Sequence, residues 1–244
     1  MAKKIEERVE ELEAEIAKLK GFTTDVVVLI DGSGSMGPLV KDTISGFNSF
    51  IDGLKNDDKT TYRVTAISFD SPAGSKIIFE SAPLDKAVLT HSNYRVGGGT
   101  PLLDAVGDTV HLADKLQNVQ LVIITDGEEN SSRRFTSEQV KQLLQDRQEK
   151  KDWAITYLGA NQDGWSTGMN LGIQNSYTFN ANVDLPRTFA NVSASSAMYT
   201  STRSEGRLAS SVSRQDIGAV MDVATDLNPE LKDQVDTDNT NSVQ

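Results

Sequence analysis

The stretch VVVLIDGSGSMG, Val26–Gly37, decides the fold and contains two overlapping motifs. Its first half is a run of β-branched and apolar residues that ends in Asp31. A continuous run of this kind is typical of a strand that is buried on both faces of a parallel sheet. The second half contains glycines at the spacing G-x-G-x-x-G and, between them, Asp31, Ser33 and Ser35 at the spacing D-x-S-x-S. The first spacing predicts a dinucleotide site, and the second predicts a site for a divalent cation.

The nucleotide interpretation fails on the rest of the sequence. A dinucleotide fold needs an acidic residue about 20 residues further on, at the end of the second strand. The acidic residue that ends the predicted second strand is Asp70, well beyond that spacing, and Asp31 would face the pyrophosphate as a second anion. A P-loop requires Lys and Ser or Thr where this sequence has Pro38 and Leu39. No serine of the stretch is flanked as G-x-S-x-G, which excludes a nucleophile elbow.

The chain beyond this stretch alternates strand and helix patterns. The sequence predicts strands over 62–70 and 75–82, which form a hairpin, and further strands over 119–127, 153–161 and 176–181. Helices are predicted from Pro38, from Thr100 as N-cap, from Thr136 or Ser137, over 165–171 and over 185–199. This order predicts an α/β fold with a doubly wound, mostly parallel, Rossmann-like sheet, one antiparallel edge strand and helices on both faces.

Two flanking segments depart from this pattern. Residues 1–21 carry the a/d seam of a coiled coil, formed by Ile5, Val9, Leu12, Ile16 and Leu19. We expect a leucine-zipper-like helix, native or engineered, that joins copies into a homo-oligomer; packing on its own domain is the alternative. Residues 203–244 are polar and acidic, which is typical of a flexible tail. The predicted globular domain is therefore 22–202.

Composition disfavours several classes of function. The chain has 244 residues and a formal net charge of -11, which disfavours nucleic acid and an anionic membrane surface as partners. It has no cysteine and two histidines, so disulfides, thiolate metal sites and a His-rich zinc site are excluded. No apolar run approaches the roughly 20 residues of a membrane span. We therefore expect no membrane association and a cytoplasmic location.

Oxygen ligands from three segments are predicted to meet at one edge of the sheet. Predicted strands deliver Asp31 and Asp126, and Thr100 begins a helix near the same edge. Ligands of doubly wound sheets bind outside the carboxyl ends of the strands. The predicted metal ligands are Asp31, Ser33, Ser35, Thr100 and Asp126. Because all five supply oxygen, they favour Mg²⁺, with Mn²⁺ or Ca²⁺ as alternatives.

The environments of several other residues in or near these motifs can also be predicted. Asp104 is expected either to orient the site or to lie on a solvated face. Glu128 and Glu129 are expected to face water, with tuning of the metal affinity as the alternative. His111 is expected at the surface, and Trp153 is expected to fill the core.

The stretches DGSGSMG, GGGTPLLDA and TDGEEN resemble the metal-ion-dependent adhesion site of the von Willebrand factor type A (vWA) domain. That site has D-x-S-x-S, then a Thr, then an Asp, and all five positions match. The resemblance extends roughly from Thr24 to Thr202, and YLGANQD is similar to bacterial and phage members. It implies a protein-binding module, not an enzyme, whose metal coordinates an Asp or Glu of a partner protein.

Two alternatives to simple adhesion stay open. An adaptor subunit for an AAA-type ATPase, a role of similar intracellular domains, would share the metal site and differ in its partner. A metal-assisted hydrolase would need a general base, and the motifs offer only the carboxylates already assigned to the metal, without a lysine.

Overall fold

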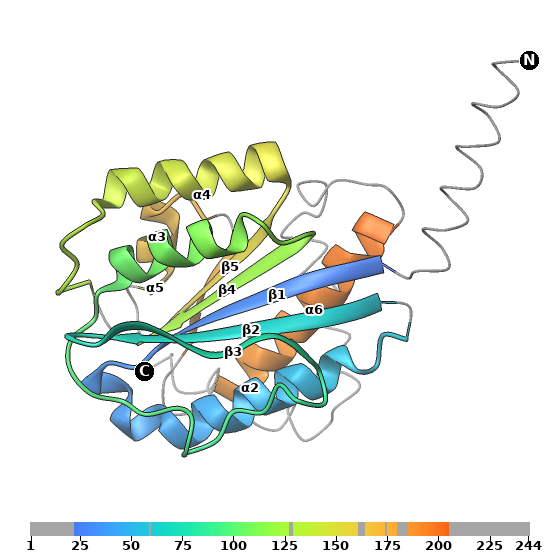
Figure 1. Ribbon diagram of the computed structural model, residues 1–244, viewed down its shortest axis with the longest axis horizontal. Helices are drawn as coiled ribbons and strands as arrows, with labels where there is room; N and C mark the ends of the chain where they lie inside the picture. Colours follow the sequence, from blue (N-terminus) through green and yellow to red (C-terminus); the bar gives the residue numbers. More distant parts are fainter. Residues whose placement is uncertain are drawn as a thin grey trace, which may run out of the picture.

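A six-stranded sheet of order β3-β2-β1-β4-β5-β6 forms the centre of the protein (Figure 1). The computed structural model describes residues 22–58, 60–126, 129–160, 164–173, 175–179 and 185–204. The strands are β1 (Phe22–Asp31), β2 (Thr60–Asp70), β3 (Gly74–Pro83), β4 (Val119–Thr125), β5 (Ala154–Ala160) and β6 (Asn175–Phe179). Edge strand β3 is antiparallel to β2, and the other neighbouring strands are parallel, which confirms the predicted sheet.

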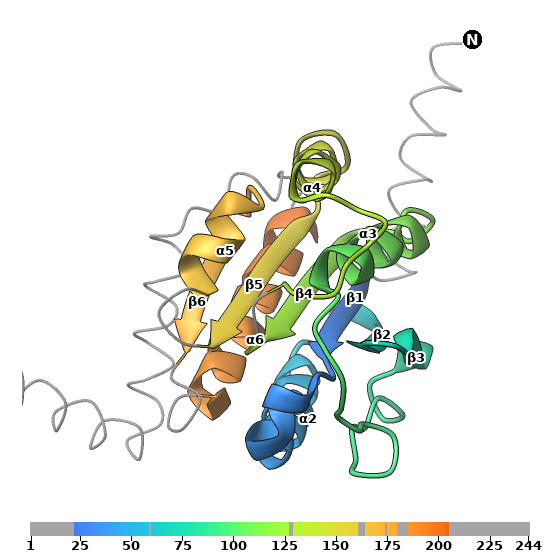
Figure 2. The same ribbon diagram turned by 90° about the vertical axis from the view of Figure 1, so that its left-hand side faces the viewer.

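Helices cover both faces of the sheet, as predicted. They are η1 (Gly34–Leu39), a 3₁₀ helix, and the α-helices α2 (Val40–Leu54), α3 (Leu102–Ala113), α4 (Ser137–Lys151), α5 (Gly164–Asn170) and α6 (Leu185–Ser204). In Figure 2, α2 and α6 lie on one side of the sheet and α3, α4 and α5 on the other. The alternation of strands and α-helices along the chain is the one that the sequence predicts.

Two predicted helix starts are wrong. Pro38 lies inside η1, and α2 begins two residues later at Val40. Thr100 is not the N-cap of α3, because Pro101 occupies that position with a ψ of 60°, outside the helical region, and the helix begins at Leu102. The α3 N-terminus has no side-chain cap of its own at Pro101. Its first amides instead bond to a distant loop, which sequence spacing does not reveal.

The core lies in two layers, one on each face of β1. Val26, Val28 and Ile30 pack with the α2 and α6 layer, while Val27 and Leu29 pack with the α3 and α4 layer. All five side chains are fully buried. Burial of an aliphatic side chain of this size contributes about 1.5–3 kcal/mol. The uninterrupted apolar run of β1 is thus required by two cores at once.

Helices α2 and α6 approach each other closely at a glycine. A Cβ built on Gly46 would lie 2.1 Å from Cδ2 of the buried Phe189. A side chain larger than hydrogen at position 46 would therefore displace the Phe189 ring. This contact fixes α6 beside α2 over the same layer of the core.

The described domain begins and ends at the amino end of the sheet. The Asn118 side chain donates from Nδ2 to the Thr23 carbonyl (2.8 Å) and accepts from the Arg203 guanidinium (3.1 Å). Arg203 also forms an ion pair with Asp152, just before β5. The start of β1 and the last turn of α6 are therefore tied to the same residue.

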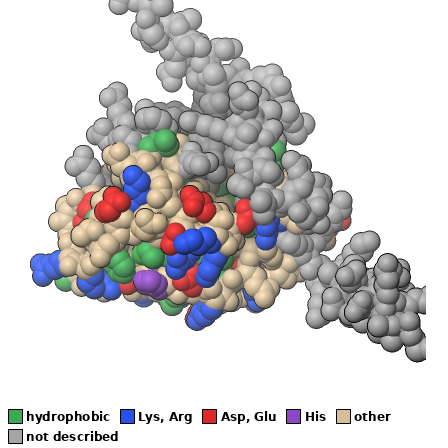
Figure 3. Space-filling model, turned by 90° about the horizontal axis from the view of Figure 1, so that it is seen from above, with side chains coloured by type: hydrophobic (Ala, Val, Ile, Leu, Met, Phe, Trp, Pro, Cys, Tyr) green, Lys and Arg blue, Asp and Glu red, His purple; other side chains and the backbone are tan. Residues whose placement is uncertain are grey.

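Some predictions fall outside the described residues. These are the coiled coil over 1–21 and the acidic tail from 205 onward. Helix α6 reaches Ser204, two residues past the predicted domain boundary. None of the helices among the described residues is long and apolar enough to cross a membrane. On the face that Figure 3 shows, acidic and basic side chains are interspersed where the described atoms are visible.

Candidate metal centre

The carboxyl ends of β1 and β4 are neighbours in the middle of the sheet. β1 ends at Asp31, β4 ends at Thr125, and Asp126 follows directly. The strand order reverses between these two strands, and such a switch point is where doubly wound sheets bind their ligands. Two carboxylates thus lie at the position where the fold places a site.

A chain of short hydrogen bonds joins four of the five predicted ligands. The Ser33 amide donates to Asp31 Oδ1 over 2.7 Å, and the Ser33 and Ser35 hydroxyls lie 3.0 Å apart. The Ser35 hydroxyl donates to Asp126 Oδ1 over 2.8 Å. Asp31 and Ser33 are buried, Ser35 is exposed and Asp126 is partly exposed, so the chain runs from the core to the surface.

Thr100, the fifth predicted ligand, is placed between the other two segments by backbone bonds. The Gly34 amide donates to the Gly98 carbonyl (3.0 Å), which ties the loop after β1 to the loop before Thr100. The Thr100 amide donates to Asn130 Oδ1 (2.9 Å), and the Asn130 amide donates back to the Thr100 carbonyl (3.1 Å). Thr100 is buried in this contact. The structure therefore brings the three predicted segments together.

Glycine is required where these loops cross. Gly98 has a φ of +74°, a region that side chains with a Cβ rarely adopt. A Cβ built there would also lie 1.7 Å from the Ser71 carbonyl oxygen. The Gly32 amide bonds to the Phe69 carbonyl over 2.7 Å at the end of β2. Gly32 of the opening motif and Gly98 of the GGG stretch thus allow close packing of backbone around the centre.

Asp31 is held by residues that the sequence did not single out. The Thr125 hydroxyl donates to Asp31 Oδ2 over 2.5 Å, and the Tyr94 hydroxyl donates to the Asp31 main-chain carbonyl over 2.6 Å. Thr125 has a recognisable signal, because it ends β4 directly before Asp126. Tyr94 has none, since it lies 63 residues from Asp31 within a loop. Both hydroxyls orient Asp31 from the protein side.

No protein cation pairs with the two carboxylates in the part of the chain that the structure describes. Burial raises the pKa of the Asp31 carboxyl, against the hydrogen bonds from Thr125 and Ser33, and burial also raises the pKa of the Asp126 carboxyl. Among the described residues, no Lys, Arg or His forms an ion pair with either one. Buried carboxylates without a counter-ion carry a desolvation cost that a bound cation would offset.

The donor set fits a small, hard cation. Octahedral Mg²⁺ binds oxygen at about 2.0–2.1 Å, so neighbouring ligand oxygens lie about 2.9 Å apart. The contacts from Ser33 to Ser35 and from Ser35 to Asp126 measure 3.0 and 2.8 Å, close to that edge length. The described residues contain no group of three or more His, Cys, Asp or Glu side chains that could hold a metal ion, so an ion here would depend on the hydroxyl ligands beside the two carboxylates.

Two acidic residues near the centre differ from expectation. Glu129 does not simply face water: its carboxylate accepts hydrogen bonds from Leu103, Ser131 and Ser132. Asp104 is buried and accepts amide hydrogen bonds from the loop over 133–135, so it does not lie on a solvated face. Glu128 lies outside the described residues. His111 is exposed and Trp153 is buried, as expected.

Comparison with known proteins identifies the fold. The chain matches no protein-family model and no curated protein sequence. Its structure is similar to a von Willebrand factor type A protein from Catenulispora acidiphila, with a TM-score of 0.53, 14% identity, and coverage of 72% of this chain and 43% of that chain. It is also similar to the vWF domain of the type V pili tip protein Mfa5 from Porphyromonas gingivalis, with a TM-score of 0.54, 12% identity, and coverage of 73% and 96%. The protein has the vWA fold.

A third solved structure extends this likeness. The PilB minor pilin from Streptococcus sanguinis has a TM-score of 0.52 and 12% identity, and the match covers 74% of this chain and 62% of that chain. The chain thus spans less than two thirds of the Catenulispora protein and of PilB, and nearly all of the Mfa5 domain. In the vWA fold of the present chain, the candidate metal centre lies at the carboxyl ends of β1 and β4.

Proposed function

We propose that this vWA-fold protein is a metal-dependent protein-binding module. A Mg²⁺ held by Asp31, Ser33, Ser35, Thr100 and Asp126 would coordinate an Asp or Glu of a partner protein. The observation that carries the proposal is the chain of hydrogen bonds between the ends of β1 and β4, where two carboxylates have raised pKa values. When bound, the ion supplies a Lewis-acidic position that a carboxylate from outside can fill.

The chain's own residues divide into an anchored and an open side. Asp31 is held by hydrogen bonds from Thr125, Ser33 and Tyr94 and is fully buried. It would therefore hold an ion from the side of the protein interior. Ser35 is exposed and Asp126 is partly exposed, so the opposite side of the centre faces solvent. This asymmetry supports a site that a macromolecular ligand reaches from outside, without a closed reaction chamber.

The solved structures support binding over catalysis. Two of them belong to pilus proteins, a minor pilin and a pili tip protein. The motifs also place no general base beside the proposed ligands other than the ligands themselves. We therefore propose no catalytic residue; an adaptor for an AAA-type ATPase and a metal-assisted hydrolase are the alternatives that the experiment below separates.

Thermal unfolding of the full chain tests metal dependence. We expect the Tm to rise in Mg²⁺ or Mn²⁺ relative to EDTA, because a ligand that binds only the folded state stabilises it. Asp31→Ala should abolish the rise, while Asp85→Ala, which removes an exposed carboxylate, should keep it. A wild-type Tm that is the same in Mg²⁺ and in EDTA would contradict the proposal.

The nature of the ligand is tested by capture with and without metal. Immobilised protein is incubated with a peptide that carries one central Asp and with the matching Asn peptide. We expect the protein to retain the Asp peptide and not the Asn peptide, and to do so in Mg²⁺ and not in EDTA. Capture of an AAA-type ATPase from the source lysate would favour the adaptor alternative. Mg²⁺-dependent hydrolysis that is lost in Asp126→Ala would favour an enzyme.

We also propose that residues 1–20 join copies of the chain into a homo-oligomer. The support is their heptad pattern, together with the position of Phe22 at the amino end of the sheet, opposite the candidate metal centre. Copies joined there would present their metal centres outward. Light scattering should give a multiple of 26.5 kDa for the wild type and the monomer mass for Leu12→Asp with Ile16→Asp. A monomeric wild type would contradict this part of the proposal.

A further inference from the structure

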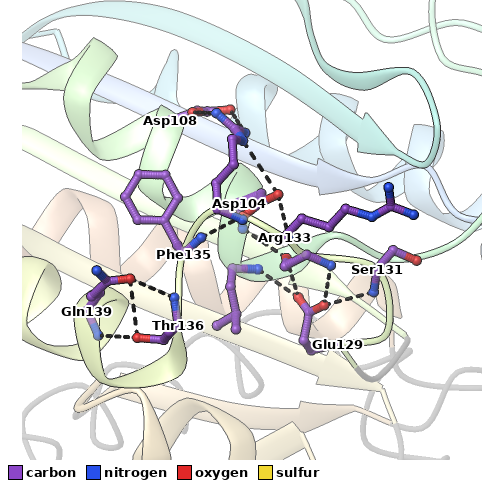
Figure 4. A network of polar contacts seen from close by, with 11 residues as sticks. Asp104, Asp108, Glu129, Ser131, Arg133, Phe135, Thr136 and Gln139 are labelled. Atoms are coloured by element: carbon purple, nitrogen blue, oxygen red, sulfur yellow. Dashed lines mark hydrogen bonds and ion pairs between the residues drawn. The ribbon is translucent and has the colours of Figure 1, made fainter.

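The loop that follows Asp126 is organised around the carboxylate of Glu129 (Figure 4). Glu129 Oε1 accepts from the Ser131 amide (2.9 Å) and the Ser132 amide (2.7 Å). Oε2 accepts from the Ser132 hydroxyl (2.7 Å) and from the Leu103 amide (2.9 Å) in the first turn of α3. Both oxygens of Glu129 thus accept hydrogen bonds from within the protein.

Glu129 and Ser132 together cap α3 from outside the helix. The N-cap residue Pro101 offers no side-chain hydrogen bond, yet the Leu103 amide bonds to Glu129 and the Asp104 amide bonds to the Ser132 hydroxyl (3.0 Å). A carboxylate at a helix N-terminus is favourable because it satisfies free amides and opposes the helix dipole. The loop after β4 therefore cannot move relative to α3 without exposing these amides.

A second bond pair lies next to the first. Asn130 exchanges two hydrogen bonds with the backbone of Thr100, at 2.9 and 3.1 Å. Thr100 lies three residues before Leu103, and Asp126 lies three residues before Glu129. The two contacts therefore clamp the segment that carries Thr100 to the segment that carries Asp126 at two adjacent points.

The far part of the loop is held separately. Burial acts to raise the pKa of Asp104, but the amides of Arg133, Arg134 and Phe135 and the Arg134 charge outweigh it, and the pKa is lowered. Arg134 also makes two bonds with Asp108, at 2.7 and 2.6 Å. In Figure 4 these contacts form the side of the network away from Glu129. These side-chain contacts do not include Glu129 or Asn130.

We propose that Glu129 and Asn130 are positioning residues that set the ion preference of the metal centre. This inference rests on the proposed metal-dependent function. Mg²⁺ demands near-ideal octahedral geometry at about 2.0–2.1 Å, whereas Ca²⁺ accepts variable geometry at about 2.3–2.6 Å. A fixed spacing between Thr100 and Asp126 favours the smaller ion, and a relaxed spacing removes that advantage.

The ratio of the two affinities separates geometry from charge. Loss of the Glu129 charge weakens attraction to any divalent cation, and Mg²⁺ and Ca²⁺ carry the same charge. A purely electrostatic role therefore lowers both affinities by the same factor. Asn130 carries no charge, so a change of ratio in Asn130→Ala reports the clamp alone.

Competition for bound Mn²⁺, followed by its electron paramagnetic resonance signal, measures both affinities on the full chain. Replacement of residues that orient metal ligands typically costs about 10–100-fold in affinity. We expect Asn130→Ala and Glu129→Gln to lower Mg²⁺ affinity by about tenfold and Ca²⁺ affinity by less, so that the ratio moves toward Ca²⁺. Asn130→Asp keeps the acceptor oxygen and should restore the wild-type ratio.

A control variant and the results that would overturn the inference complete the experiment. Glu138→Gln removes an exposed charge in the first turn of α4 and should leave the ratio unchanged. If the Glu129 variant fails to fold, the two variants at the exposed Asn130, Asn130→Ala and Asn130→Asp, test the inference by themselves. A wild type that binds Mg²⁺, with an unchanged ratio in Asn130→Ala, overturns this inference and leaves the proposed function standing. A wild type that binds neither ion overturns both.

Discussion

The carboxylates at the two ends of the sheet have different kinds of hydrogen-bond partner. At the amino end, Asp25 makes two bonds with Arg63, at 2.8 and 2.6 Å. There too, Arg147 pairs with Asp114 at the end of α3, and Arg203 pairs with Asp152. At the carboxyl end, the partners of Asp31 and Asp126 are hydroxyls and amides, and no protein cation pairs with them among the described residues.

This difference separates stability from binding. A carboxylate paired with a guanidinium is satisfied inside the protein, and breaking the pair exposes its desolvation cost. A carboxylate surrounded by neutral donors keeps its attraction for a cation from solution. Natural proteins tolerate such costs at functional sites, where the local optimum for stability is given up. Variants at each end should therefore change different observables.

The largest effect is expected for Asp31→Asn at the carboxyl end. The variant should lose the Mg²⁺-dependent rise in Tm completely, because the anchored ligand of the centre is gone. The metal-free variant should be at least as stable as wild type, since the amide keeps one acceptor for the Ser33 amide and removes a buried charge whose pKa is raised. Calorimetry in EDTA and in Mg²⁺ measures both. A metal-free variant several degrees less stable would break the comparison.

A smaller effect is expected for Arg63→Ala at the amino end. It leaves Asp25, 2% exposed, with the Gln117 amide as its remaining partner outside the pair. We expect the free energy of unfolding to fall by about 2–3 kcal/mol, below the 3–5 kcal/mol of fully buried pairs, because Arg63 is 41% exposed. The response to Mg²⁺ should persist. Urea unfolding measures the loss.

The matched control for Arg63→Ala is an exposed pair. Lys55 and Asp52 are both largely exposed, so Lys55→Ala should cost less than about 1 kcal/mol. Equal losses in the two variants would show that the amino end does not depend on its internal ion pairs.

The smallest effect is the acid sensitivity of the amino end. Hydrogen bonds from Arg147, followed by those from Lys151, lower the pKa of Asp114 below its ordinary value of 3.8. Its contribution to stability is therefore complete above about pH 4 and is lost as the pH falls through the lowered pKa. Urea unfolding from pH 6 to 3 should show a steeper loss for wild type than for Asp114→Asn. Parallel pH profiles would contradict the assignment.

The strands and helices could be predicted because their signals are local. The β1 run is apolar throughout, since both cores need it, and Thr136 with Gln139 forms the capping box that starts α4. Four of the predicted metal ligands lie at the end of β1 or in the residues that follow β1 and β4, so topology alone brings them together. The start of α3 was mispredicted because Pro101 displaces Thr100 from the N-cap position.

The surroundings of the site could not be predicted for a physical reason. Glu129 bonds to Leu103 across 26 residues, and Asn130 bonds to Thr100 across 30. No periodicity or motif spacing encodes contacts between loops of this separation. An acidic residue beside a polar loop is compatible with solvent exposure until the helix that needs its oxygens is placed. The supporting residues of a site are therefore harder to find than its ligands.

Asn118 has a mechanical consequence. Its side chain contacts Thr23 in the first strand and Arg203 in the last helix. A pulling force on either end of the described domain therefore acts at the same end of the sheet. A load passed between these two points is resisted by the Asn118 amide and the Arg203–Asp152 pair, at the far end of β1 from Asp31. A domain anchored in this way can be held under tension by its ends while the loops around Asp126 stay unstretched.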